Sequence, residues 1–231
     1  MRTTVFLSSL RSASHTIPEE IEHIEKWALG CNMKLNRQKT KEIIFRRQKY
    51  DVSLLPPPIP TIERIREMNI LGVTFTETFS VSPHVQKIMS KGHQILYGLK
   101  ILKAQGLKGA DLQRVAKNLS YSSLFYASPA WRGFLTKEET LLLNSLLRKA
   151  YKWGFVREEP PPIDTLFDEF DDNLFSKILN NPNHSLHFLL PPKKHTNYNL
   201  RPRVHSHSLP ATSTTLTKKN YLQRMIFKNS Y

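Results

Sequence analysis

The stretch SPHVQKIMSKGHQILYGLKILKAQG, residues 82–106, decides the fold of this chain. Its apolar side chains recur every three or four residues, which is the period of an α-helix that buries one side. Ser82 and Pro83 are typical of a helix start, and Gly106 is placed to close the last turn. The pattern therefore predicts a long helix whose buried stripe is Val85, Ile88, Met89, Ile95, Leu96, Leu99 and Leu102.

Two further helices follow with the same period. The second covers 109–127, and its apolar stripe is Leu112, Val115, Ala116, Leu119 and Tyr126. Thr136 and Glu139 have the spacing of a capping box, so a third helix begins there and continues through LLLNSLLRKAYKWGF, residues 141–155. Residues 81–159 are therefore predicted to form one helical domain.

The region before the first long helix has a mixed pattern. Residues 16–34 have the period of an amphipathic helix, and KEIIF, 41–45, is a β-prone run. Four prolines within 56–60 force an extended connector, and residues 69–79 are β-branched and aromatic enough for a strand pair. These features predict a small α+β domain over residues 1–80.

After residue 160 the composition changes twice. An acidic helix is predicted over 163–180. From 181 onward Pro, Asn, His, Ser and Thr predominate, so a low-order basic tail is expected, with one short helix within 217–227. Residues 160–231 thus form a third region, and the whole chain is expected to be an α+β protein that is mostly α.

Charge is the strongest compositional signal. The 231 residues carry a net charge of +15, distributed as +11 over 1–159, −4 over 160–180 and +8 over 181–231. A pI near 9.9 favours a polyanionic partner, with nucleic acid first. No apolar run is long enough to span a membrane, and a single cysteine, Cys31, excludes an internal disulfide framework and a Cys-based zinc site. Cys31 itself is expected to be a small buried side chain.

Several stretches together resemble the C-terminal part of a reverse transcriptase from a non-LTR (LINE-type) retrotransposon. WALGCNMKLNRQKTKEIIF (27–45) is similar to the family's late palm segment, and ILGVTFTETFSVSPHVQKI (70–88) to its Leu-Gly-Val strand pair and the start of its thumb. LYGLKILKAQGL, SSLFYASPAWRGFLT and RKAYKWGF resemble the thumb helices. DDNLFSKILNNPNHSLHFLLPP, YNLRPRVHSHSLP and YLQRMIFKNSY resemble the extreme C-terminus of metazoan members, and all the stretches keep the family's order.

The resemblance gives an interpretation of MRTT, residues 1–4. In the family, the palm helix follows a strand that carries the tetrad Tyr-Ala-Asp-Asp. Counting back from SASHTIPEE places Thr3 and Thr4 where those two carboxylates are expected, so the N-terminus is interpreted as the stump of a longer palm. The alternatives are a mitochondrial presequence, which is also rich in Arg and Ser, and a disordered lead-in. Nucleus or cytoplasm is favoured over mitochondria as the location.

The resemblance also implies that the polymerase site is missing. The family's reaction uses two Mg²⁺ ions held by carboxylates, and a threonine hydroxyl is a far weaker ligand. The other metal-binding aspartate of the family and its fingers lie upstream of the matching stretches. No cofactor is therefore expected, since Mg²⁺ is implied only for the intact family enzyme. Lys39 matches a family lysine thought to protonate pyrophosphate, and without the metals only phosphate contact or simple solvation is left for it.

Basic residues on the predicted thumb helices indicate contact with nucleic acid. Lysine and arginine on helix faces suit the backbone of a duplex, although a solvated helix face is the alternative for each residue alone. The expected partner is an RNA–DNA hybrid or other nucleic acid, bound without sequence preference. No membrane partner is expected, and the sequence indicates no oligomeric state. The predicted binding residues are Lys39, Lys87, Lys91, Arg114, Lys117, Arg148, Lys149 and Lys152.

Three other groups of residues have simpler interpretations than a site. The acidic cluster at 164, 168, 169, 171 and 172 has a face that could hold a cation, but a solvated face, or one that meets the basic tail, is favoured. The histidine pairs at 184 and 187 and at 205 and 207 are interpreted as polar loop residues and not as ligands. The three tryptophans, Trp27, Trp131 and Trp153, are expected in the core.

The sequence thus predicts a truncated, catalytically inactive reverse-transcriptase-like protein with residual affinity for nucleic acid. One alternative is a domesticated basic protein that binds DNA or RNA, and another is a basic protein targeted to mitochondria. A third is an enzyme subunit whose missing palm comes from another chain.

Overall fold

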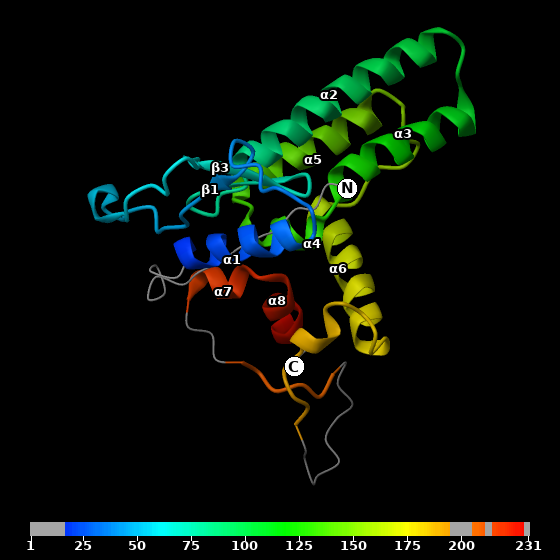
Figure 1. The fold of residues 1–231 in the computed structure, drawn as a ribbon. Helices are drawn as coiled ribbons and strands as arrows, with labels where there is room; N and C mark the ends of the chain where they lie inside the picture. Colours follow the sequence, from blue (N-terminus) through cyan, green and yellow to red (C-terminus); the bar gives the residue numbers. More distant parts are fainter. Residues whose placement is uncertain (1–16, 195–204, 211–213, 229–231) are drawn as a thin grey trace. The chain divides into compact units, whose positions relative to one another are not determined.

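The computed structural model describes residues 17–194, 205–210 and 214–228, which are mostly helical with two small sheets (Figure 1). The predicted class, α+β and mostly α, is confirmed. In this described part of the chain, no helix is both long and apolar enough to cross a membrane. The chain divides into two units: residues up to 70 together with 76–79, and residues 71–75 together with 80 onward.

The first unit holds one helix and three short strands. Its elements are α1 (Ile17–Gly30), β1 (Lys41–Glu42), the 3₁₀ turn η2 (Val52–Leu54), β2 (Glu63–Arg64) and β3 (Glu67–Ile70). β1 and β2 pair in parallel, and the facing residues also form ion pairs, Lys41 with Glu63 and Arg64 with Glu42. The buried apolar side chains among its described residues are only Ile21, Ala28 and Ile62. Backbone pairing and ion pairs, more than a core, therefore join β1 and β2.

Several details of this unit differ from the sequence prediction. The strand expected over 41–45 pairs only at 41–42, and the helix expected over 16–34 ends at Gly30. Trp27 is 54% exposed and Cys31 is also exposed, so the predictions that both are buried are wrong. The physical reason is that helical period shows which side of α1 is apolar but not whether another element covers it.

The second unit is a helical bundle together with most of β4. Its first part contains β4 (Val73–Thr76), α2 (Ser82–Ala104), α3 (Gly109–Phe125), α4 (Ser128–Trp131), the 3₁₀ turn η3 (Arg132–Phe134) and α5 (Lys137–Lys152). β3 and β4 form the predicted strand pair, which begins at Glu67, two residues before the predicted range of 69–79. The capping box is confirmed: the Thr136 hydroxyl accepts from the Glu139 N–H at 3.2 Å, and the Glu139 carboxylate accepts from the Thr136 N–H at 2.8 Å.

The core of this unit uses most of the predicted apolar stripes. Trp131 of α4 is fully buried, as predicted, with its ring edge-on to Phe167. Leu102, Leu119 and Tyr126 are exposed, contrary to the prediction, because the stripes extend past the sides that neighbouring helices cover. The buried members from α2, α3 and α5 are Val85, Ile88, Leu96, Leu99, Leu112, Ala116, Leu124, Leu143, Leu146 and Leu147.

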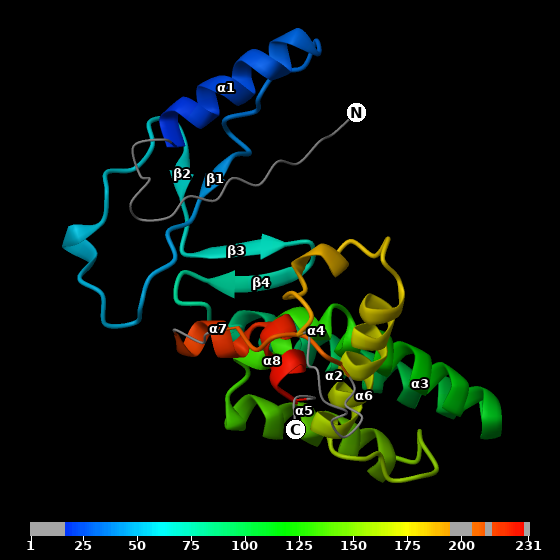
Figure 2. The ribbon, with the colours of Figure 1, turned by 90° about the horizontal axis from the view of Figure 1, so that it is seen from below.

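The helices α2, α3 and α5 lie side by side (Figures 1 and 2). Gly92 permits close packing of α2 on α5, since a Cβ at that position would lie 2.3 Å from Leu146 Cδ2. Contacts between these two helices keep the same order along both, which shows that the helices run in the same direction. The contacting pairs are Gly92 with Leu146, His93 with Lys149, and Lys103 with Trp153.

The C-terminal part of this unit contains α6 (Ile163–Asn180), the 3₁₀ turn η4 (His187–Leu189), α7 (Thr215–Lys219) and α8 (Tyr221–Lys228). α6 occupies the span of the predicted acidic helix. The short helix expected within 217–227 is present as α7 and α8, and it packs on α6, so the described tail has more order than its composition indicates. The small core that joins α6 to α8 consists of Phe175, Ile178, Tyr221, Met225 and Ile226.

Candidate nucleic-acid interface

A basic surface forms where the second half of α2 meets the end of α5. α2 contains no Asp or Glu along its whole length, and the acidic residues of α5 are confined to its first turn. Because the two helices run in the same direction, their basic C-terminal parts lie side by side. This surface, which we call the α2–α5 basic face, consists of His93, Lys100, Lys103, Lys149 and Lys152.

Two contacts hold the cations of this face in place. Lys149 Nζ lies 3.3 Å from His93 Nε2, and Lys103 Nζ donates to the backbone carbonyl of Trp153 at 2.9 Å. Lys100 follows His93 by seven residues and precedes Lys103 by three, so it lies on the same side of α2. The two helices therefore contribute to one surface.

The electrostatic character of the α2–α5 basic face follows from its missing carboxylates. All five side chains are exposed. Within the described part of the chain, none of them forms an ion pair with an acidic residue. Clustered cations without acids raise the local positive potential and attract phosphates. Lysine is a compact point charge, which suits phosphate contact without reading the base sequence.

Two aromatic side chains are exposed beside these cations. Tyr97 is 66% exposed and lies four residues after His93 and three before Lys100, on the same side of α2. Trp153 is 45% exposed and directly follows α5. The prediction that Trp153 belongs to the core is wrong, because α5 ends just before it and its indole packs edge-on against Phe155.

The eight binding residues predicted from the sequence are all exposed, and they come from α2, α3, α5 and the first unit. Only Lys149 and Lys152 belong to the α2–α5 basic face. Lys87 donates to Thr74 Oγ1 at 3.0 Å. It also lies six residues from His93, about 240° around the helix, so Lys87 and Lys91 occupy another flank of α2.

The other predicted residues are dispersed. Arg114 and Lys117 lie on α3. Arg148 lies on α5 and lines a pocket that also contains an acidic residue. Lys39 belongs to the first unit, where its backbone N–H donates to Asn36 Oδ1 at 3.1 Å, as in an Asx turn. The binding of nucleic acid by these residues therefore stays a prediction.

Sequence reasoning missed three residues of the face, His93, Lys100 and Lys103. The sequence did contain a pattern that indicates them. The 23-residue segment of α2 has no Asp or Glu, and His93, Lys100 and Lys103 follow one another at spacings of seven and three residues. The spacing alone could not show that this side of α2 lies next to the basic end of α5. The packing of Gly92 against Leu146 in the folded chain shows it.

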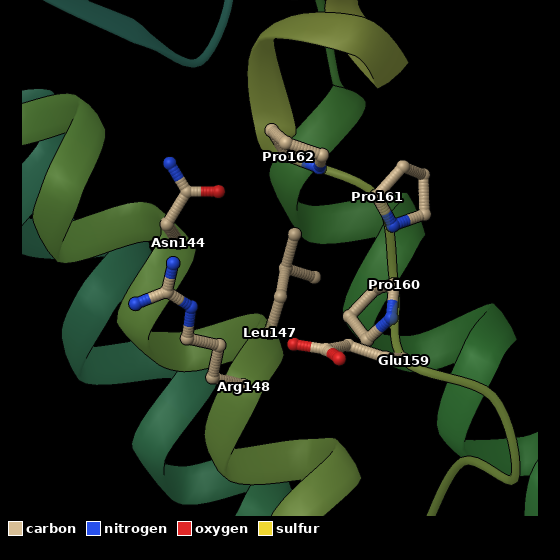
Figure 3. A pocket seen from close by; sticks show the side chains of 7 residues that line it. All are labelled: Asn144, Leu147, Arg148, Glu159, Pro160, Pro161 and Pro162. Atoms are coloured by element: carbon tan, nitrogen blue, oxygen red, sulfur yellow. The ribbon is translucent and has the colours of Figure 1, made fainter.

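The pocket beside Arg148 has a volume of about 310 Å³ (Figure 3). Figure 3 shows Arg148 on α5 and Glu159 on the facing connector, so opposite charges line the same hollow. Asn144, which is also in the lining, accepts a hydrogen bond from the backbone N–H of Ile163 at 2.8 Å and so holds the start of α6. The other lining residues are Leu147, Pro160, Pro161 and Pro162. This lining offers no nucleophile with a neighbouring base.

The predicted acidic cluster meets cations from two other elements, in a group that we call the α6–α8 junction. Asp171 is fully buried, and its Oδ2 lies 2.6 Å from Arg132 Nε and 2.7 Å from Arg224 Nη1. Arg132 Nη2 also lies 2.6 Å from Asp168 Oδ1. Lys228 Nζ lies 3.0 Å from Asp172 Oδ2. The favoured interpretation of the acidic face, as one that meets the basic tail, is therefore correct for these three carboxylates.

The charged groups of the α6–α8 junction shift the pKa values of their neighbours. Burial alone would raise the pKa of the Asp168 carboxyl, but Arg132 and Lys228 hold that pKa below its ordinary value. Burial raises the pKa of the Tyr221 hydroxyl, and the Asp171 carboxylate raises it further. That hydroxyl donates to the Asp171 backbone carbonyl at 2.9 Å. The junction is thus a set of ion pairs with a structural role, although the second carboxylate oxygen of Asp171, Oδ1, is buried without a hydrogen-bond partner among the described residues.

The remaining candidate ligands also have structural partners. His187 Nδ1 lies 2.7 Å from the carbonyl of Ile178, and His207 Nδ1 lies 2.5 Å from that of Pro191. His205 and His207 lie outside the named helices and strands, as the sequence indicated, but both are buried and so help to anchor the tail. No cluster of three or more His, Cys, Asp or Glu side chains suited to a metal ion occurs in residues 17–194, 205–210 and 214–228. Thr3 and Thr4 lie outside these residues.

Comparison of the chain with protein-family models, with curated proteins and with solved structures found no match in any of the three. The order of the sequence motifs and the geometry of the α2–α5 basic face are therefore the grounds on which a function is proposed.

Proposed function

We propose that this protein is a non-catalytic relative of the non-LTR retrotransposon reverse transcriptases that binds nucleic acid through the phosphate backbone. The α2–α5 basic face is the observation that carries this proposal. It brings four lysines and a histidine from two helices onto one exposed surface, and no carboxylate within the described residues neutralises them. Such a surface suits a polyanion better than any small ligand.

The sequence motifs support the family part of the proposal. The palm-like and thumb-like stretches follow the family's order, and the thumb-like stretches include the second half of α2, the end of α3 with α4 and η3, and the end of α5. Thr3 and Thr4 occupy the positions where the family has two metal-binding carboxylates. Because two-metal polymerase chemistry needs anionic ligands, the proposed activity is binding without nucleotide transfer.

The ligand proposed is an RNA–DNA hybrid or another nucleic acid, bound without sequence preference. Lysine side chains supply charge and reach, but they lack the planar fork that reads base edges in pairs. Affinity should therefore come from counterion release and fall steeply as salt rises. Each phosphate contact contributes about 0.7 to 0.9 to the slope of log K against log salt concentration.

The test is a salt titration of binding to a fluorescently labelled RNA–DNA hybrid. Replacing Lys100, Lys103, Lys149 and Lys152 with Gln should reduce that slope by roughly three, since up to four phosphate contacts are lost. The same protein, given primer, template, nucleotides and Mg²⁺, should extend no primer. Template-dependent incorporation would contradict the non-catalytic part of the proposal.

The matched control removes the same net charge elsewhere. Lys34, Lys49, Lys137 and Lys177 are exposed and lie outside the α2–α5 basic face, so their replacement with Gln should leave most of the slope intact. Equal losses in the two fourfold variants would show that the net charge of the chain, and not this face, explains the binding.

A further inference from the structure

The α2–α5 basic face has a feature that phosphate binding alone does not require. Tyr97 and Trp153 expose 66% and 45% of their surface among its cations. Tyr97 lies between His93 and Lys100 on α2. The backbone carbonyl of Trp153 accepts a hydrogen bond from the side chain of Lys103. A single exposed aromatic side chain is ordinary. Two of them among clustered cations, however, provide both components of a surface that binds single strands: cations for the phosphates and aromatic rings for the bases.

The two components act on different parts of a nucleic acid. Cations bind the phosphates of any strand, whether paired or unpaired. Aromatic rings stack on base faces, and in a duplex those faces are covered by the neighbouring base pairs. An exposed ring therefore adds affinity only where bases are unpaired, and it does so without base preference because every base has a π-face.

We infer that the α2–α5 basic face binds a single-stranded segment of nucleic acid, with Tyr97 and Trp153 stacking on its bases while the lysines hold its phosphates. This inference rests on the proposed function and goes beyond it by naming the strand state of the ligand. Trp153 is well placed for this role. Its indole is supported from one side by Phe155, with ring centroids 6.1 Å apart and planes at 89°, and Phe155 is itself buried. A ring braced by the core loses little freedom when a base stacks on it.

The experiment compares two probes on the full chain at one salt concentration. One probe is an oligothymidylate of about 20 nucleotides, longer than the footprint of a small single-strand-binding domain, and the other is a DNA duplex of the same length. The variants Tyr97→Leu and Trp153→Leu keep every charge and most of the apolar surface. Each should weaken oligothymidylate binding by about 5-fold or more, leave duplex binding unchanged, and leave the salt slope of both unchanged.

Tyr151→Leu is the matched control for these variants. Tyr151 is also an exposed tyrosine, 40% exposed, but it lies two residues and so about 200° around α5 from Lys149. Its replacement should not change the affinity for either probe. If Tyr151→Leu weakens oligothymidylate binding as much as Tyr97→Leu does, stacking at the face is contradicted.

A second measurement needs no change at the site. In the variant Trp27→Phe, the tryptophans left are Trp153 and the fully buried Trp131, so fluorescence quenching by a bound strand reports Trp153. Saturable quenching by oligothymidylate and none by duplex supports the inference. Binding of both probes without quenching overturns the inference but leaves the proposed function standing, whereas no binding of either probe overturns both.

Discussion

The α2–α5 basic face and the α6–α8 junction contain the same kinds of cation in opposite settings. In the junction, Arg132, Arg224 and Lys228 each lie against a carboxylate of α6. On the face, Lys149 contacts a histidine ring and Lys103 a backbone carbonyl, and neither forms an ion pair with an acid among the described residues. The formal charge of a segment therefore does not measure the charge that a ligand can reach. The tail carries +8 by sequence, yet two of its cations are already paired inside the molecule.

The two regions also differ in what holds them together. The junction depends on matched charges around a fully buried carboxylate, so it should be sensitive to the loss of a charge. The α2–α5 basic face depends on the close approach of two helices at a glycine, so it should be sensitive to added volume.

The largest effect is expected for Asp171→Asn. This change removes the carboxylate that Arg132 and Arg224 share and leaves their partly buried charges without full compensation, which costs about 3–5 kcal/mol. Chemical denaturation of the full chain measures the loss. Asp164→Asn is the control, because Asp164 lies on the same helix but is exposed, and its replacement should change the unfolding free energy by less than about 0.5 kcal/mol. An equal loss of unfolding free energy in the two variants would show that the buried carboxylate of the junction contributes no more to stability than an exposed one.

A smaller effect is expected for Gly92→Ala. The new Cβ would lie 2.3 Å from Leu146 Cδ2, so α2 and α5 must separate or Leu146 must repack, at about 1–3 kcal/mol. Gly98→Ala is the control, since nothing lies within 4 Å of a Cβ at that position. It should stabilise the protein by about 0.5–1 kcal/mol through helix propensity. Thermal unfolding of both variants tests this, and a stable Gly92→Ala chain with unchanged binding would show that close packing is not needed for the face.

The smallest effect is a dependence on pH that only the junction should show. Arg132 and Lys228 hold the pKa of Asp168 below its ordinary value of 3.8. A carboxyl with a lowered folded-state pKa contributes stability above its unfolded-state value and loses it as the pH falls through the folded-state value. The difference in unfolding free energy between the native chain and Asp168→Asn should be under about 1 kcal/mol, because the pair is partly exposed, and should shrink as the pH falls from about 5 to 2.

Lys100→Gln on the α2–α5 basic face serves as the control for that measurement. Its effect on stability should stay constant over the same pH range, because the described residues include no carboxylate paired with Lys100. A pH-independent effect of Asp168→Asn would mean that its ion pairs contribute nothing to stability.

Much of the local structure could be predicted from the sequence. The period of apolar residues located α2 and α3, the Thr136–Glu139 pair located the start of α5, and the acidic helix predicted over 163–180 is present as α6. These features depend on interactions between residues a few positions apart, which one sequence contains in full. The site was less predictable, because only Lys149 and Lys152 of the expected set belong to the α2–α5 basic face.

Contacts between distant residues explain the failures. Trp27 lies on α1, whose apolar side is covered only in part, and Cys31 lies in the turn just after that helix ends. Trp153 follows the end of α5, where the position of the ring depends on where the helix stops and on Phe155. Whether a side chain is buried depends on the elements that pack against it, and the apolar period of one helix gives no information about those elements.

The sequence by itself determined the helices, the strand pair, the cap of α5, the excess of positive charge and the acid-free composition of α2. The tertiary structure alone decided which cations are available. Packing at Gly92 brings the basic parts of α2 and α5 together, and packing of α8 on α6 pairs Arg224 with Asp171, 53 residues away. The physical reason is the separation along the chain over which each kind of interaction acts. Capping and helical period act within a few residues, whereas ion pairing and burial depend on distances in space that the order of residues does not fix.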